Sequence, residues 1–131
     1  MNNCKIYNVD RSGILARGGH IKASNTIIAN SNQYNLVTLR GGNYNFRHCT
    51  FVNYAVDLVS RNEPILSYRD YEIQYINGVE TAVRDSGTAY FTNCIIYGNK
   101  NEEVEVLEFI ENNTFFNYRF ENCLMLSLIH I

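Results

Sequence analysis

Three arginines are the residues of this sequence best placed to bind a charged ligand. Aligning short apolar segments puts Arg17, Arg40 and Arg69 at the same position of three successive repeats. If each segment is a strand of one stacked sheet, the guanidinium groups point outward about 5 Å apart and repel one another. The ordinary compensation is acidic neighbours; the functional one is an anionic ligand such as a uronate or sulfated sugar, which arginine binds bidentately. The acidic residues that could compensate are Glu63, Asp70, Glu105 and Glu108.

A long insertion at residues 70–87 directly follows Arg69 and brings two tyrosines beside the arginine row. Tyr71 and Tyr75 could stack on sugar rings, although exposed tyrosines in a loop are common. The candidate substrate-binding residues are therefore Arg17, Arg40, Arg69, Tyr71 and Tyr75.

No catalytic residue can be assigned from the sequence. The Gly-x-Ser-x-Gly and His-Glu-x-x-His motifs are absent, and so is a phosphate-binding glycine loop. Glycoside hydrolysis needs two carboxyl groups about 5 to 9.5 Å apart on one face. Asp57, Glu63 and Asp70 lie near the arginine row, but no pattern aims them at one another. The sequence therefore leaves enzymatic activity open and favours a protein that is not an enzyme.

A row of thiols is the second repeated feature, formed by Cys4, Cys49, Cys94 and Cys123. The chain has no Cys-x-x-Cys pair, so the spacing argues against a tetrahedral zinc site. Stacking of small side chains inside a coil explains the spacing, and we expect free buried thiols. A disulfide between Cys94 and Cys123 is the alternative, since neighbouring coils satisfy the required Cα distance. The sequence predicts no metal and no cofactor.

The elements that carry these residues come from a repeated phrase of Asn, then Cys or Thr, then alternating apolar residues. It begins at Asn3, Asn25, His48, Asn93 and Asn122, in steps of 22, 23, 45 and 29 residues. A repeat of this size indicates a solenoid. The phrase is the first strand of each repeat; residues 13–17, 36–40 and 65–69 are second strands, and residues 21–24, 44–47, 89–92 and 118–121 are third strands.

Alternation with period two places one side of each strand inward, so that like residues stack in rows. Three parallel strands per turn predict an all-β fold, a right-handed parallel β-helix of about four to five coils. Gly18-Gly19 and Gly41-Gly42 suit tight corners. The corner position of His48 favours a structural role for that histidine. A leucine-rich repeat is the rival solenoid, but its leucine pattern is missing.

Length and composition support one domain. The formal net charge of −2 gives no reason to expect a nucleic-acid partner, and no apolar run is long enough for a transmembrane segment. We expect residues 1–125 to be a partial β-helix domain cut at both ends. Residues 126–131 match the translation of a transposon-derived sequencing adapter and are expected to be a tail of that origin; the alternative is a natural apolar strand.

Residues 41–50 (Gly-Gly-x-Tyr-x-Phe-x-His-Cys-Thr), Asn53-Tyr54 and residues 93–98 resemble the right-handed β-helix repeat proteins of Bacteroidetes. These are mostly uncharacterised surface or periplasmic lipoproteins of the pectin-lyase-like superfamily. The resemblance covers roughly residues 3–125 and implies an extracellular, cell-surface or periplasmic location. The superfamily's calcium-binding aspartates and paired catalytic aspartates have no counterpart in this sequence.

The leading hypothesis is therefore a non-catalytic β-helix segment of an exported bacterial surface protein, acting as a scaffold or binding acidic polysaccharide. One alternative is a fragment of a polysaccharide lyase acting on uronate-containing glycans, with an arginine such as Arg69 as base. Another is an adhesin stalk that contacts protein. The sequence specifies no oligomeric state.

Overall fold

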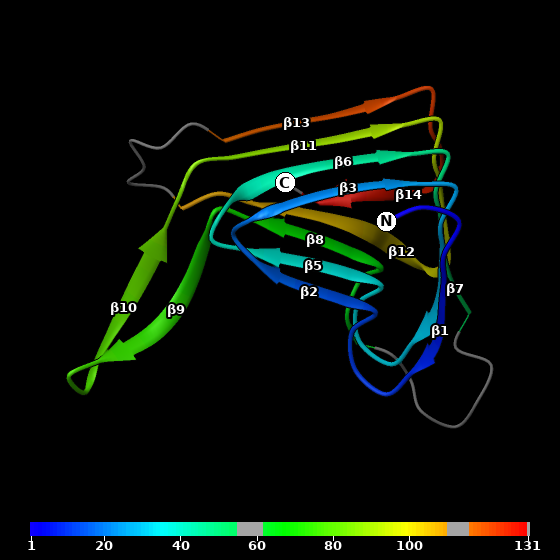
Figure 1. Ribbon diagram of the computed structural model, residues 1–131. Coiled ribbons are helices and arrows are strands. Elements are labelled where there is room, and N and C mark those ends of the chain that lie inside the picture. The colour runs from blue at the N-terminus through cyan, green and yellow to red at the C-terminus, as the bar shows by residue number, and fades with distance from the viewer. Residues whose placement is uncertain (55–61, 110–115, 131) are drawn as a thin grey trace.

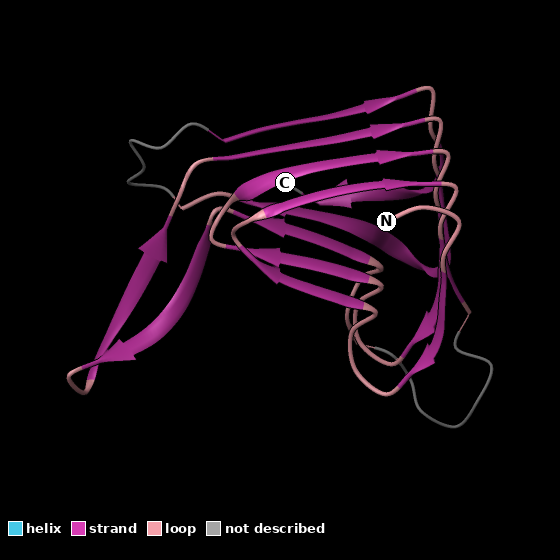
Figure 2. Cartoon of the chain, in the orientation of Figure 1, coloured by secondary structure: helices cyan, strands magenta, loops and turns pink. Residues whose placement is uncertain are grey.

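The computed structural model describes residues 1–54, 62–109 and 116–130, and the elements in these ranges are strands joined by turns (Figure 2). Side-chain positions are described for the same ranges except residues 126–130. No helix of a length and apolarity that could cross a membrane occurs in the described residues.

The strands form three faces that the chain visits in turn (Figure 1). Face 1 contains β1 (Lys5–Val9), β4 (Ile27–Ser31), β7 (Thr50–Asn53), the first part of β12 (Ile95–Leu107) and β14 (Leu124–His130). Face 2 contains β2 (Ile14–Arg17), β5 (Leu36–Leu39), β8 (Leu66–Arg69) and the last part of β12. Face 3 contains β3 (His20–Ser24), β6 (Gly42–Arg47), β11 (Gly87–Thr92) and β13 (Phe116–Glu121).

Strands within each face pair parallel with the strands of the coils before and after. This arrangement confirms the predicted parallel β-helix with three strands per coil, in four coils and the first strand of a fifth. The backbone of residues 126–130 continues β14 beside β12. The expected adapter origin of residues 126–131 stays a prediction.

The interior is built from rows of like side chains, as the alternation predicted. Phe46, Phe91 and Phe120 stack with ring centroids 5.3 and 4.9 Å apart and nearly parallel planes. A second row, formed by Ile6, Ile28, Phe51, Ile96 and Met125, packs against them. Because each ring covers the ring of the next coil, apolar area is removed from water inside the solenoid itself.

The cysteines form the predicted interior row and are free thiols. Cys49 and Cys94 are buried, and each donates a hydrogen bond to a backbone carbonyl of the preceding coil, Ala23 at 3.7 Å and Phe46 at 3.4 Å. The hydrogen bond between the two thiols, together with burial, raises the pKa of Cys94. The row therefore serves packing, with the thiol protons used to satisfy carbonyl groups.

The corner from face 3 to face 1 has one conformation in every coil. Its residues have φ between 50° and 54°, the left-handed region, and are Asn3, Asn25, His48, Asn93 and Asn122. Asparagine tolerates this region better than most residues. His48 shares the conformation, which supports the structural role predicted for it. The corner from face 2 to face 3 uses Gly18-Gly19 and Gly41-Gly42, all with positive φ, as expected.

A polar row that the sequence did not indicate lies inside the corner between faces 1 and 2. Asn35 is fully buried, and its amide donates to the carbonyls of Ile28 at 2.8 Å and Val52 at 3.0 Å. Asn53 donates to the Ser31 carbonyl at 2.6 Å and to the Asn35 side-chain oxygen at 3.2 Å. These amides satisfy carbonyls where the chain leaves the sheet of face 1.

Expectations about face 2 and its insertion are corrected by the structure. Arg17 pairs with Leu39, so Arg40 lies one residue beyond the row, at a corner with φ 61°. A row position for Arg40 would by alternation also place Thr38 outward, but Thr38 is buried. The insertion at 70–87 is a hairpin rather than a loop: β9 (Tyr71–Ile76) pairs antiparallel with β10 (Val79–Arg84) around Asn77-Gly78, and it projects from the solenoid (Figure 1).

Two further segments lengthen their repeats, residues 54–63 and the segment around residues 111–113. Both fall mostly outside the described residues, and so does Asp57.

The repeated corner predicts a specific pattern of mutational tolerance. Asn93→Ala should lower the free energy of unfolding by about 1 to 2 kcal/mol, because alanine tolerates the left-handed region poorly. Asn93→Gly should be nearly neutral. Urea denaturation measures both, with Asn117→Ala on an exposed strand position as the matched control. Equal losses for the alanine and glycine variants would contradict the backbone explanation.

Candidate functional site

The outer side of face 2 carries two rows set by the strand register. The first row is Leu15, Val37, Ser67 and Glu105, and the second is Arg17, Leu39, Arg69 and Leu107. Arg17 and Arg69 are thus separated by a leucine, two strand spacings apart. Their mutual repulsion is weaker than the continuous arginine row would have given.

Arg69 is the centre of a hydrogen-bonded group, which we name the Arg69 cluster: Tyr34, Glu63, Ser67, Arg69 and Glu105. Arg69 donates from Nη2 to the Tyr34 hydroxyl at 3.0 Å and to Glu105 Oε2 at 3.2 Å. Its Nε donates to Ser67 Oγ at 2.9 Å, and Ser67 donates to Glu105 at 2.6 Å. Tyr34 in turn donates to Glu63 Oε2 at 2.8 Å.

Burial and neighbouring groups shift the pKa values of Arg69 and Tyr34. Burial alone would lower the pKa of Arg69, but the nearby Tyr34 and Glu105 raise it. Burial and the hydrogen bond to Glu63 raise the pKa of Tyr34 to about 12. Both groups therefore keep their protons at neutral pH, and the cluster holds one cation between two carboxylates.

Arg17 pairs with a residue of the hairpin instead. Its Nε lies 2.6 Å from Oε1 of Glu72, on β9, with 52% of the arginine side chain exposed. Partial burial of Glu72 would raise its pKa, but hydrogen bonds from Arg17 and Gln74 and the charges of Arg17 and Arg40 lower it. Glu72 therefore ties the hairpin to face 2.

Glu105 is the acidic neighbour that was predicted for Arg69. Glu63 is connected to the same arginine through Tyr34. Asp70 instead bonds to the backbone of Phe109. Asp70 is fully buried, its Oδ1 accepts the Phe109 N–H at 2.9 Å, and burial raises its pKa. Acidic neighbours thus provide the compensation that the arginine pattern required.

The two candidate tyrosines lie at different places on the hairpin. Tyr71 packs against Phe109, with ring centroids 5.7 Å apart, at the base of the hairpin. Tyr75 lies near the hairpin tip with 76% of its surface exposed. The structure therefore brings Arg69 together with Glu105 and, through Tyr34, with Glu63. Tyr71 is close enough to raise the pKa of Arg69, whereas Tyr75 lies near the hairpin tip.

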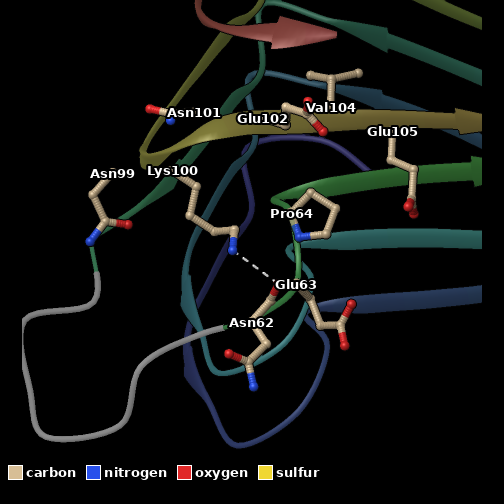
Figure 3. A pocket seen from close by; sticks show the side chains of 9 residues that line it. All are labelled: Asn62, Glu63, Pro64, Asn99, Lys100, Asn101, Glu102, Val104 and Glu105. Carbon is tan, nitrogen blue, oxygen red and sulfur yellow. Dashed lines mark hydrogen bonds between the residues drawn. The ribbon is translucent and has the colours of Figure 1, made fainter. Parts of the chain in front are cut away.

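A hollow of about 660 Å³ lies beside the Arg69 cluster and shares Glu63 and Glu105 with it (Figure 3). Lys100 donates from Nζ to the Asn62 carbonyl at 3.0 Å across this hollow. Its lining is mostly polar and consists of Asn62, Glu63, Pro64, Asn99, Lys100, Asn101, Glu102, Val104 and Glu105. Residues 99–102 were not among the predicted site residues, although they form a dense polar run, which lies within β12.

The chemistry available at this site is hydrogen bonding. Amide, carboxylate and ammonium groups line one open hollow. Among the described residues, no group of three or more His, Cys, Asp or Glu side chains is arranged to hold a metal ion.

The comparison with protein families agrees with the strand arrangement. The model of the right handed beta helix region matches residues 1–128. No curated protein and no solved structure matches the chain.

The two ion pairs should differ in what they contribute to stability. Arg69→Ala should lower the free energy of unfolding by about 1 to 3 kcal/mol, because three half-buried polar partners lose their donor. Arg17→Ala should cost less than about 1 kcal/mol, because that pair is exposed. Chemical denaturation of both variants tests the ranking. A larger loss for Arg17→Ala would contradict the cluster's role in the fold.

Stability should also fall in alkali. Tyr34 keeps its proton in the folded state up to a pKa of about 12, whereas an unfolded tyrosine loses it near 10. The folded state therefore binds the proton more tightly, so this contribution is complete below pH 10 and is lost as pH rises towards 12. Tyr34→Phe should flatten the decline seen in denaturation between these pH values. Tyr75→Phe, on the exposed hairpin, is the control and should follow the parent chain.

Proposed function

The chain belongs to the right-handed β-helix family, and from that premise we propose that it is a non-catalytic segment of an exported bacterial surface protein that binds glycans. The binding surface in this proposal is the hollow together with the Arg69 cluster. The inner rows of the solenoid serve as a rigid scaffold that holds this surface.

The observation that carries the proposal is the composition of the hollow. Three asparagines, three glutamates and one lysine line it, together with Pro64 and Val104. Sugar hydroxyls are both donors and acceptors, so they suit a lining that mixes amide groups with carboxylates. The Arg69 cluster supports this reading, because its hydrogen bonds hold Glu63 and Glu105 in place before a ligand arrives.

The charge of the hollow favours a neutral glycan over the acidic polysaccharide expected from the sequence. Glu63, Glu102 and Glu105 outnumber Lys100 among the lining residues. The guanidinium of Arg69 is already paired with Glu105, and that of Arg17 with Glu72. A uronate would meet excess negative charge here, whereas a neutral sugar would not.

The same contacts disfavour the polysaccharide lyase alternative at this site. A lyase base must accept a proton, and the raised pKa of Arg69 makes its guanidinium a poorer acceptor. An elimination also needs a second cation to neutralise the uronate carboxylate. Arg17, a cation on the same face, is engaged by Glu72 on the hairpin.

Affinity electrophoresis in gels containing neutral or acidic polysaccharides tests the proposal. We expect neutral glycans to retard the protein more than acidic ones. Asn99→Ala and Asn101→Ala should weaken the retardation about two- to tenfold, because each removes a hydrogen-bonding amide from the lining. Asn117→Ala, on face 3, is the matched control and should not change it.

Three outcomes would count against the proposal. Retardation by acidic glycans alone would contradict the charge argument. New absorbance from unsaturated uronates would favour the lyase. No retardation in any gel would remove glycan binding and leave a scaffold or a protein-contacting stalk.

A further inference from the structure

The outer side of face 1 differs from the other two faces in carrying almost no charge. Two rows of side chains point outward from it. The first is Lys5, Ile27, Thr50, Ile95 and Leu124, and the second is Tyr7, Ala29, Val52 and Tyr97. Lys5, in the first coil, is the single charged member of these two rows.

Large apolar side chains on this face are open to solvent. The exposed fractions are 61% for Tyr7, 40% for Ile27, 42% for Ile95 and 55% for Leu124. Because they belong to strands stacked in register, they form one continuous patch rather than scattered positions. Continuous apolar patches of this kind mark interaction sites on soluble proteins.

Face 3 of the same solenoid gives the internal comparison. Its outward side chains include His20, Lys22, Arg47, Arg119 and Glu121. The backbone geometry of the two faces is equivalent, so the fold does not require face 1 to be apolar. Depletion of charge is the compositional feature of the buried centre of protein interfaces and of homodimer interfaces in particular.

We propose that the outer side of face 1 is the surface through which two copies of this chain associate. The two-fold axis lies along β7, between the two sheets. This operation reverses the order of the coils and keeps the position along each strand, so β7 packs on its counterpart and β4 packs on β12 of the second copy.

The sequence of the two rows fits this operation. In the second row, Tyr97 faces Ala29 of the other copy, so a large side chain meets a small one in both symmetry-related places. Val52 meets its own counterpart on the axis. In the first row, Ile95 faces Ile27 of the other copy and Thr50 faces Thr50. Lys5 falls at the edge, opposite Leu124, where its ammonium can stay in water.

The size of the patch sets the strength of the expected dimer. Five strands about 4.8 Å apart and two outward positions per strand give a footprint of about 24 by 13 Å. Two such faces together cover roughly 600 Å², which is below the size of standard specific interfaces, so the association should be weak and reversible. A lipid surface or a nucleic acid fits less well, because Lys5 alone supplies a positive charge.

Sedimentation velocity of the 131-residue chain from about 1 μM to about 1 mM tests the proposal across the range of weak interfaces. We expect a reversible monomer–dimer equilibrium. Thr50→Arg should weaken it at least about tenfold, because two cations would meet on the two-fold axis. The matched control is Thr92→Arg on face 3, which should leave the equilibrium unchanged. Circular dichroism of both variants checks that they fold.

A mixing experiment makes the test independent of folding defects. Thr50→Asp alone should also dissociate, but an equal mixture of Thr50→Arg and Thr50→Asp should form a heterodimer. A monomer at every concentration would overturn the proposal, and so would a dimer that tolerates Thr50→Arg. Asn101→Ala should leave the dimer unchanged, so this outcome is separate from that of glycan binding.

Discussion

Every coil of this protein must return to the same point around the axis, and the rest of the structure depends on that constraint. A strand can pair in register with the strand of the next coil only if the corners repeat. The chain meets this demand with a left-handed residue at each corner between faces 3 and 1, where φ stays between 50° and 54°. Once the corners repeat, like residues stack automatically, and the phenylalanine and cysteine rows follow from strand geometry.

The interior positions are therefore restricted to stacked rows of like residues. The three faces differ from one another in their outward side chains. Face 3 is charged, face 1 is apolar, and face 2 is cross-linked. The Arg69 cluster takes Tyr34 from the second coil, Arg69 from the third and Glu105 from the fourth. Hydrogen bonds that run along the axis in this way tie successive coils together through side chains as well as through the backbone ladder.

The sequence predicted the inner rows because their alternation is strict, and it predicted the asparagine corners because few residues accept that backbone. It placed Arg40 wrongly because Leu36, Val37 and Leu39 are apolar on both sides of the strand, so alternation could not fix the register. Asn77-Gly78 between alternating segments was a readable hairpin signal that was interpreted as a loop. The contact of Tyr34 with Arg69 could not be predicted, because it depends on a turn whose path the repeat does not determine.

The cysteine row provides a way to measure when neighbouring coils separate. Cys49 and Cys94 are almost completely sealed between coils, with about 1% of their surface exposed, while Cys123 is partly open. A thiol reagent can reach the sealed sulfurs only when a coil separates from its neighbour. The rate at which each thiol is labelled therefore reports how often its own coil opens. Comparing the rates would show whether the solenoid frays from its ends or opens as one unit.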